Sequence, residues 1–472
     1  MELFYRPKNA VLGDVIPFYD DGKFKPFYLK NRRDYRGAEV KNGWHMLTTE
    51  DHINFTEHFT GISGGTGSVL KVDGLYYLFY CTFESNPKKQ YVRLATSPDL
   101  DAWTVRDEVN FSADDVVYDY AEWRDPHVFW NGEANEWWML VASAIKGKTA
   151  RRACVGLCTS KDLWHWEYKE PFYAPMAAGG ACECPDIFKI GDWWYLTYSN
   201  YCDRFTGMYR MSKSLNGPWI RPERDTFDSR AYYAPKTGTD GKRRYIYGWN
   251  PTKEANPKKF DHDYPISRDT CTWDWGGTLV VHEIIQNQDG TLRVIPEEHV
   301  NNALKTKEPL IMEPIIGKWA TKADSASVVA DRGFAGLLLN QVPGMCKLEL
   351  DVTFAPGTRR FGVALQLDEN MDMGYYLYLE PGRNRIEYVS GIRFYGDGGK
   401  MFPYAVEMER PFSLEPDTKY NMKIFVQDTV LVVYLNDEVA MNARMYDYKN
   451  RRFGLFCADG EARFEHIALY TE

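Results

Sequence analysis

The stretch Asp73-Gly74-Leu75-Tyr76-Tyr77-Leu78-Phe79-Tyr80 joins a turn dipeptide to a run of aromatic and aliphatic residues. An Asp-Gly pair beside such a run is a strong signal for a β-hairpin. The same unit occurs five times in the first part of the chain, with its turn glycines spaced by 52, 58, 59 and 50 residues. These are Gly22, Gly74, Gly132, Gly191 and Gly241. A repeat of this period predicts the blades of a five-bladed β-propeller.

A second segment recurs about one strand after each hairpin and ends in an aromatic residue. In the second copy it reads Thr96-Ser97-Pro98-Asp99-Leu100-Asp101-Ala102-Trp103, and related segments cover 48–55, 159–166 and 212–219. We interpret it as an outer turn with a packed aromatic at its end. Its constant position supports the same repeat.

Three carboxylates hold nearly one position in this repeat. Asp14 and Glu183 lie eight residues before the turn glycine of their copies, and Asp125 lies seven before it. The first strand of each propeller blade lines the central axis, so we expect these side chains to point into one shared funnel. Thr66 and Tyr233 hold the same position in the second and fifth copies.

The aromatic repeat stops near residue 298. Residues 301–322 contain two prolines and no clear strand period, so we expect a linker there. Beyond it, alternating runs such as 346–352 and 430–436 are separated by Pro-Gly and Gly-rich turns, which is typical of a β-sandwich. We therefore predict an all-β chain, with a five-bladed β-propeller over 1–300, a linker over 301–322 and a β-sandwich over 323–472.

The composition excludes several classes of function. The net charge of −9 is spread without a basic stripe, which argues against nucleic-acid binding. No apolar run is long enough to span a membrane, and the N-terminus lacks the basic and apolar regions of a signal peptide. Nine cysteines without regular spacing fit reduced thiols, so we expect a cytoplasmic protein. Aromatic residues form 15% of the chain, and their faces can stack on sugar rings.

Cys182 and Cys184 flank Glu183 and raise the question of a zinc site. Both thiols of a Cys-x-Cys pair on a strand point to one face, but no second pair at ligand spacing and no histidine cluster completes four ligands. We interpret these cysteines as small side chains of a crowded inner strand. We expect no metal ion and no organic cofactor.

Acids that share a funnel suit cleavage of a glycosidic bond. One carboxylic acid must protonate the leaving oxygen, and one carboxylate must attack the anomeric carbon or activate water. A third anion can bind hydroxyl groups and stabilise positive charge. Glu183 is the strongest candidate, because it stands among apolar strand residues where an acid has no structural purpose.

Several motifs in the chain resemble those of a known family. Trp123-Arg124-Asp125-Pro126 resembles the Arg-Asp-Pro motif of glycoside hydrolase family 32, the invertase and fructanase family, and Glu183-Cys184-Pro185-Asp186 resembles its Glu-Cys motif. Further similar segments are Gly65-Thr66-Gly67-Ser68, Trp44-His45-Met46-Leu47-Thr48 and Tyr233-Ala234-Pro235 with Gly248-Trp249. The resemblance covers the whole chain, since members of that family add a C-terminal β-sandwich.

The resemblance implies a retaining β-fructosidase that acts on a small carbohydrate. Asp14 would be the nucleophile, Glu183 the general acid and then base, and Asp125 the stabiliser of the transition state. Arg124 would position a neighbouring acid. Glu183 is expected to carry the raised pKa, because it must be protonated while Asp14 is ionised. Substrate contacts are expected from Arg124, Trp44, His45, Thr66, Tyr80, Asp186, Tyr233 and Trp249.

The nucleophile segment departs from the family pattern. The family usually reads Trp-Met-Asn-Asp-Pro-Asn-Gly, whereas this chain has Val11-Leu12-Gly13-Asp14-Val15-Ile16-Pro17-Phe18. The family's asparagine beside the nucleophile helps to grip the fructosyl ring, and Gly13 has no side chain to do so. The sugar bound here can therefore differ from the terminal β-fructose of sucrose.

Two alternatives stay open. A related five-bladed family of arabinofuranosidases and xylosidases also uses two Asp and one Glu, but inverts configuration with carboxyl groups roughly 6.5 to 9.5 Å apart instead of roughly 5 Å. The other alternative is a carbohydrate-binding propeller that has lost turnover. The residues also do not separate hydrolysis from glycosyl transfer, because both pass through one covalent intermediate.

Overall fold

The computed structural model describes residues 1–33, 39–177, 179–202, 204–253, 268–390 and 408–472. In these ranges the chain is built almost entirely of β-strands. It forms two compact units, one of Met1, Tyr5–Pro251 and Trp275–Leu292, the other of Glu2–Phe4, Thr252–Asp274 and Arg293–Glu472. This division differs from the expected boundary at residue 300. Asp269 belongs to the second unit because it accepts hydrogen bonds from the Tyr375 hydroxyl and the Tyr446 backbone N–H.

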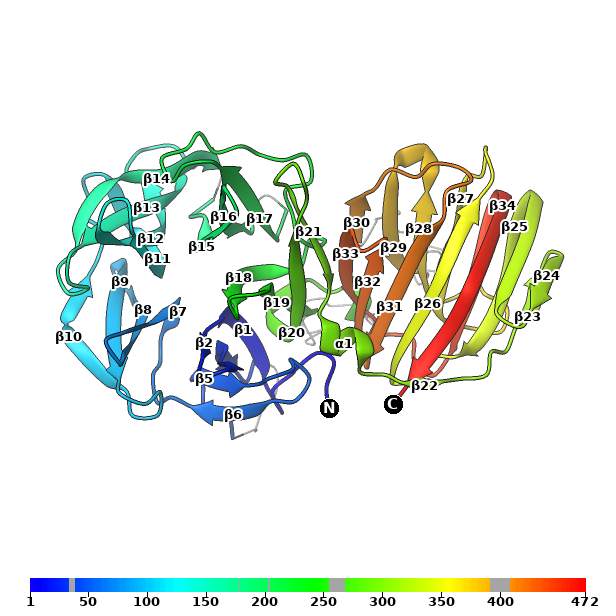
Figure 1. The fold of residues 1–472 in the computed structure, drawn as a ribbon, viewed down its shortest axis with the longest axis horizontal. Coiled ribbons are helices and arrows are strands. Elements are labelled where there is room, and N and C mark those ends of the chain that lie inside the picture. Colours follow the sequence, from blue (N-terminus) through cyan, green and yellow to red (C-terminus); the bar gives the residue numbers. More distant parts are fainter. Residues whose placement is uncertain (34–38, 178, 203, 254–267, 391–407) are drawn as a thin grey trace. The chain divides into compact units, whose positions relative to one another are not determined.

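The first unit is a five-bladed propeller. Its inner strands are β1 (Val11–Ile16), β7 (Gly65–Val72), β11 (Tyr118–Asn131), β15 (Glu183–Ile190) and β18 (Tyr233–Thr239). Figure 1 shows these strands at the middle of a ring of sheets. Each contacts the inner strands of the blades before and after it, and β18 contacts β1, so the ring closes. The predicted architecture is confirmed.

The other strands extend each blade outward. Blade one adds β4 (Phe27–Asn31), β5 (Gly43–Thr48) and β6 (Thr56–Phe59), with a small ladder of β2 (Tyr19–Asp20) and β3 (Lys23–Phe24) after β1; blade two adds β8 (Leu75–Ser85), β9 (Lys88–Ser97) and β10 (Thr104–Phe111); blade three adds β12 (Glu136–Ile145), β13 (Ala153–Ser160) and β14 (Glu167–Ala177); blade four adds β16 (Trp193–Asn200) and β17 (Thr206–Ser212); blade five adds β19 (Arg244–Lys253) and β20 (Trp273–Gln286). The aromatic runs of these strands fill the space between blades, as Phe79 and Trp123 do between blades two and three. β20 also pairs with β1, which links the last blade to the first.

Each inner strand contains a β-bulge. The register against the second strand shifts within residues 13–16, 65–67, 124–127, 183–186 and 233–236. Four of the bulged residues have left-handed backbone, with φ of 45° at Asp14, 57° at Asp125, 49° at Cys184 and 47° at Ala234. This conformation is strained for residues other than glycine, and bulges redirect side chains at functional sites. The repeated bulge therefore aims a set of side chains at the axis.

The second repeated segment forms a capped turn between the third and fourth strands of a blade. In blade three the Ser160 hydroxyl accepts a backbone N–H at 2.9 Å, and the Asp162 carboxylate accepts two more at 2.9 Å each. The indole of Trp166 then donates to a turn carbonyl at 3.1 Å. The segments 48–55 and 96–103 form the same Ser/Thr and Asp caps. Such caps satisfy turn N–H groups that no strand partner reaches.

The second unit is a β-sandwich whose layers share one long strand. β34 (Arg452–Thr471) pairs with β25 (Ser325–Gln341) along one edge. On its other edge, its first half pairs with β27 (Arg360–Leu367) and its second half with β26 (Met345–Phe354). One layer continues from β27 through β28 (Tyr375–Glu380), β29 (Arg385–Ser390) and β30 (Met408–Pro411), and the other from β26 through β31 (Tyr420–Gln427), β32 (Val430–Leu435) and β33 (Val439–Arg444).

The residues expected to form a linker carry short elements that belong to this sandwich. They are β22 (Thr306–Lys307), β23 (Glu313–Ile316) and β24 (Trp319–Lys322), preceded by β21 (Leu292–Pro296) and α1 (Glu298–Asn302). β22 pairs with β34, and β23 and β24 pair with β25. Strands this short contain too few residues for an alternating pattern, which is why the sequence did not reveal them. The remaining short helices are η2 (Arg268–Thr270) and η3 (Pro381–Arg383), and no helix in the described ranges is long and apolar enough to cross a membrane.

Replacing Asp51 by alanine should destabilise blade one without changing the fold. Its carboxylate accepts N–H groups from Ile53 and Asn54, and losing this net hydrogen bonding costs about 1 kcal/mol. Although burial opposes the shift, hydrogen bonds from Asn54 lower the pKa of Asp51 below 3.8. The stabilisation is therefore present above that pH and is lost as pH falls through the lowered pKa. Urea unfolding at pH 7 and pH 3 should show a smaller difference between variant and wild type at pH 3, and an equal difference would contradict this account.

Candidate active site

The five bulges align the blades residue by residue. The pre-bulge residues are Gly13, Gly65, Arg124, Glu183 and Tyr233; the bulge residues are Asp14, Thr66, Asp125, Cys184 and Ala234; the post-bulge residues are Ile16, Gly67, His127, Asp186 and Lys236. Asp14 and Asp125 are thus equivalent, but Glu183 is equivalent to Arg124 and not to Asp125. Counting from the turn glycine misplaced it by one residue, because the turns differ in length between blades.

Glu183 is held by the pre-bulge residues of the two neighbouring blades. Arg124 donates from Nη2 to its Oε1 at 2.9 Å, and the Tyr233 hydroxyl donates to its Oε2. Arg124 is itself fixed by Glu122 and by Gln90. Burial raises the pKa of Glu183, Arg124 opposes that rise, and Asp125 adds to it. Glu183 is therefore an acid in a fixed orientation, and its burial favours the protonated form.

Asp14 has fewer compensating partners. Its Oδ1 accepts a long hydrogen bond of 3.4 Å from the Trp249 indole. Burial, followed by the charges of Asp125 and Glu183, raises the pKa of Asp14 from 3.8 to about 7, against the opposing effects of Trp249 and Lys236. The expectation that Glu183 alone carries a raised pKa is therefore corrected. Both acids are shifted upward, because both are buried beside another carboxylate.

Asp125 is locked to the neighbouring blade. Its Oδ2 accepts the backbone N–H of Cys184 at 2.9 Å, and the thiols of Cys184 and Cys81 lie 3.7 and 4.0 Å from its carboxylate oxygens. Arg124 Nε lies 3.9 Å from Oδ2. The residue is only 5% exposed. These contacts hold the Asp125 carboxylate in a fixed position, as a residue that binds hydroxyl groups requires.

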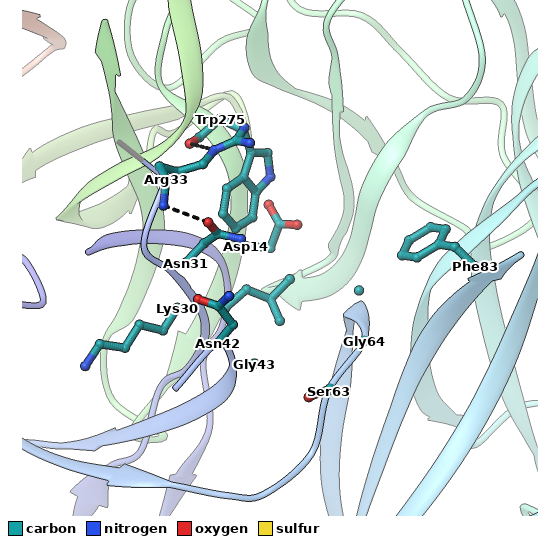
Figure 2. Close-up of a pocket in the computed structure, with 12 residues that line it drawn as sticks. Asp14, Lys30, Asn31, Arg33, Asn42, Gly43, Ser63, Gly64, Phe83 and Trp275 are labelled. Carbon is teal, nitrogen blue, oxygen red and sulfur yellow. Dashed lines mark hydrogen bonds between the residues drawn. The ribbon is translucent and has the colours of Figure 1, made fainter. Parts of the chain in front are cut away.

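Asp14 faces a cavity of about 440 Å³. Its other lining residues are Leu29, Lys30, Asn31, Arg33, Asn42, Gly43, Ser63, Gly64, Gly65, Phe83 and Trp275. Figure 2 shows the Trp275 indole beside Asp14, with Phe83 on the opposite wall. Arg33 donates from Nε to the Trp275 carbonyl at 3.3 Å, and its guanidinium lies 5.4 Å from the indole centroid. The cavity therefore has an acid at one point and aromatic and cationic groups around it.

Trp275 explains why residue 13 is glycine. A Cβ at position 13 would lie 2.3 Å from Cζ2 and 2.5 Å from Cη2 of the indole, well inside van der Waals contact. The indole thus fills the space next to the candidate nucleophile that a side chain at residue 13 would need. An apolar ring takes the place of a polar side chain there, so the wall beside Asp14 favours stacking over hydrogen bonding.

Five of the expected substrate contacts lie elsewhere. Trp44 is fully buried and Tyr80 is 3% exposed, both in the core of blades one and two. His45 bonds to the Lys41 carbonyl and pairs with Glu57. Thr66 is 1% exposed, and Asp186 is 2% exposed and accepts two hydrogen bonds from Thr237. Strand alternation accounts for Trp44 and Tyr80, because it sends every second side chain of β5 and β8 into the packing between sheets.

The other expected residues do meet at the axis. Arg124, Tyr233 and Trp249 contact the acids directly, as described above. The sequence did not single out Trp275, Phe83 or the polar residues after β4, although Ser63 and Gly64 directly precede the recognised Gly65-Thr66 segment. Glycines before an inner strand are the signal that could have found this rim, since they let the backbone border a cavity.

No group of His, Cys, Asp and Glu that could hold a metal ion is found among the residues the structure describes. Cys182 and Cys184 are buried free thiols. Cys182 packs in a hydrophobic cluster and Cys184 beside Asp125. Both thiols are therefore packed inside the propeller.

Comparison with known proteins places this site in a family context. The family model described as "Glycosyl hydrolases family 32 N-terminal domain" matches residues 6–289. The levanbiose-producing levanase of Bacillus subtilis (strain 168) is 23% identical over 96% of this chain and 87% of that protein, and the sucrose-6-phosphate hydrolase of Escherichia coli is 23% identical over 90% and 85%. The solved structure of fructan 1-exohydrolase IIa from Cichorium intybus superposes with a TM-score of 0.72 at 13% identity, covering 99% of this chain and 96% of that one.

Replacing Trp249 by phenylalanine should raise the pKa of Asp14 above about 7, because the indole N–H stabilises the ionised form. Titration of ¹³C-carboxyl-labelled aspartate by NMR measures this directly. The matched variant Tyr233→Phe removes a donor from Glu183 instead, and should raise the pKa of that residue. A Trp249→Phe enzyme in which Asp14 titrates at lower pH would show that the indole does not stabilise the carboxylate.

Proposed function

The chain belongs to glycosyl hydrolase family 32 and is a glycoside hydrolase, and from this premise we propose that it hydrolyses a β-fructofuranosidic bond with retention of configuration. The observation that carries the proposal is the division of labour among the acids. Asp14 faces the cavity, Glu183 is oriented by Arg124 and Tyr233, and Asp125 is fixed by the Cys184 backbone. Retaining hydrolysis needs a nucleophile, a proton donor and a group that binds the sugar.

In the first step Asp14 attacks the anomeric carbon while Glu183 protonates the leaving oxygen, so that a glycosyl ester forms on Asp14. In the second step Glu183 removes a proton from water, and the water oxygen displaces Asp14 from the same carbon. Asp125 binds sugar hydroxyls and stabilises the oxocarbenium-like charge in both steps. Arg124 keeps the Glu183 carboxylate stable after it has given up its proton.

The proton must reside on Glu183 and not on Asp14 when catalysis begins. The pKa values of both acids are raised, so the two acids compete for a proton, and a small change in surroundings decides which of them carries it. Sugar hydroxyls donated to Asp14 would favour its ionised form, and a leaving oxygen near Glu183 would accept from its protonated form. Substrate binding therefore completes the arrangement that the mechanism needs.

The proposed substrate is a small fructoside or fructo-oligosaccharide. The relatives above are named for levan, sucrose 6-phosphate and fructan, which all contain fructofuranosyl units. The Trp275 wall offers an apolar face to the ring where Gly13 offers no hydrogen bond, so we expect stronger dependence on ring stacking than on hydroxyl contacts at this point. We further place the enzyme in the cytoplasm, which its nine free cysteines support.

Replacing Glu183 by glutamine should lower kcat/KM on natural fructosides by about a hundredfold or more, because an amide cannot protonate the leaving oxygen. Aryl fructosides with acidic leaving groups need no proton and should lose much less. Glu122→Gln is the matched control, since it changes the other carboxylate bound to Arg124. The control should lose less activity and treat both substrates alike. Equal losses on both substrates in Glu183→Gln would remove Glu183 from this role.

Replacing Asp14 by asparagine should abolish turnover, and more completely than Asp125→Asn, because an amide cannot form the glycosyl ester. The same change should stabilise the fold at high pH. The pKa of Asp14 is raised from 3.8 to about 7, so its contribution to stability is present below 3.8 and is lost as pH rises through 7. Melting temperatures should therefore favour the variant at pH 8 and converge with wild type at pH 4. Measurable turnover in a pure, folded Asp14→Asn enzyme would contradict the assigned nucleophile.

A further inference from the structure

One step below the acids, the post-bulge residues place a second polar layer on the propeller axis. His127 Nε2 lies 3.2 Å from Asp186 Oδ1, and Asp186 Oδ2 accepts both the backbone N–H and the hydroxyl of Thr237 at 2.7 Å. Arg244 donates to the same hydroxyl at 2.8 Å. Lys236 extends from blade five across the axis and donates from Nζ to the Gly67 carbonyl of blade two at 2.8 Å.

Lys236 is an unusual residue for this position. It is 2% exposed, and lysine is almost never fully buried unless an opposite charge compensates it. Its ammonium group donates a hydrogen bond to the neutral carbonyl of Gly67. The negative charge that compensates the buried ammonium group must therefore come from nearby acids. Asp186 supplies it within the second polar layer, and the catalytic acids supply it from the layer above.

His127 does not provide this positive charge. Burial lowers the pKa of His127 to about 4. The negative charge of Asp186 opposes this shift, and the positive charges of Lys236 and Arg244 add to it. The imidazole is therefore neutral at physiological pH. Arg244 is turned toward Thr237 and the Phe188 ring, 4.5 Å away. Lys236 is thus the cation of this layer that acts on Asp14.

Without Lys236, the negative charges of the three acids exceed the positive charges around them. Asp14, Asp125 and Glu183 carry up to three negative charges, and Arg124 is already shared between Glu183 and Glu122. Burial raises the pKa of the Cys81 and Cys184 thiols and of the Tyr233 hydroxyl, so these neighbours remain neutral. The other charged residues that line the cavity with Asp14 are Lys30, which pairs with Glu57, and Arg33, whose guanidinium lies 5.4 Å from the centroid of the Trp275 ring.

We propose that Lys236 is a positioning residue that favours the charged, attacking form of Asp14 by holding a buried ammonium group beneath the three acids. The proposal rests on the function proposed above, because it assigns Asp14 as the group that must be ionised. Lys236 contacts neither the substrate nor the reacting atoms, and acts through Asp14. Its hydrogen bond to Gly67 fixes where the charge stands.

A purely structural role is the competing account, since the same bond ties blade five to blade two. Lys236→Gln separates the two, because the glutamine amide can still donate to the Gly67 carbonyl but carries no charge. Lys236→Arg keeps the charge, and Lys236→Met removes both charge and donor. Lys347→Met is the matched control in the sandwich, where another buried lysine donates to a backbone carbonyl, that of Asn301, at 3.0 Å.

The test is the pH dependence of kcat/KM together with the NMR titration of Asp14. In Lys236→Gln the acidic limb of kcat/KM and the Asp14 titration should both move to higher pH, by about one unit, so that activity at low pH falls about tenfold and largely recovers above the new limb. Lys236→Arg should keep the wild-type limb, and Lys347→Met should change neither curve.

Two results would overturn the proposal. One is a Lys236→Gln enzyme whose activity falls by the same factor at every pH. The other is an unchanged Asp14 titration in that variant. If Lys236→Gln melts below the assay temperature, Lys236→Arg and the low-temperature NMR titration still decide the question. The NMR result does not depend on turnover, so it stands even if Asp14→Asn shows that the proposed nucleophile is wrong.

Discussion

Three carboxylates lie together near the axis of this propeller, and the other residues of the site stabilise them at this short separation. Like charges at close range in a buried site raise each other's pKa until some of them stay protonated. The structure meets this constraint differently for each acid. Glu183 accepts hydrogen bonds from a guanidinium and a phenol. Asp125 accepts one from a backbone N–H, and Asp14 accepts one long hydrogen bond from an indole. The acid with the weakest support is the one that faces the cavity, where substrate hydroxyls can supply what is missing.

The β-bulge is the local device that brings these groups together. In a regular strand successive side chains alternate, so neighbouring residues could not both approach the axis. The inserted residue breaks that alternation and lets Arg124 and Asp125 both reach the acids from one strand. Left-handed φ values at Asp14, Asp125 and Cys184 are the conformational cost of this arrangement. The strain is tolerated because ladder pairing on both sides of each bulge holds the backbone in place.

Much of this architecture could be predicted from the sequence, because glycine turns and aromatic strands repeat at a fixed period. The resemblance to glycoside hydrolase family 32 is confirmed by the family model, and the propeller and sandwich by the structure. The rim of the site could not be predicted in the same way. Trp44 and Tyr80 were placed there by their position in motifs, but the parity of their strands turns them into the core. The sequence does not indicate that Lys236 belongs to the site, because a lysine on a strand gives no sign of being buried.

The change at the nucleophile illustrates the same limit and shows what the structure adds. Read in the sequence, Gly13 is a lost contact to the sugar. In the structure it is half of a steric pair, since Trp275, far along the chain, occupies the space that any side chain at residue 13 would need. The two positions must therefore change together, and neither can be interpreted alone. An indole beside Asp14 also removes a polar neighbour from a carboxylate that already has few hydrogen bonds. The ionised form of Asp14 therefore depends more on the charge of Lys236 in the second polar layer than it would if residue 13 carried an amide.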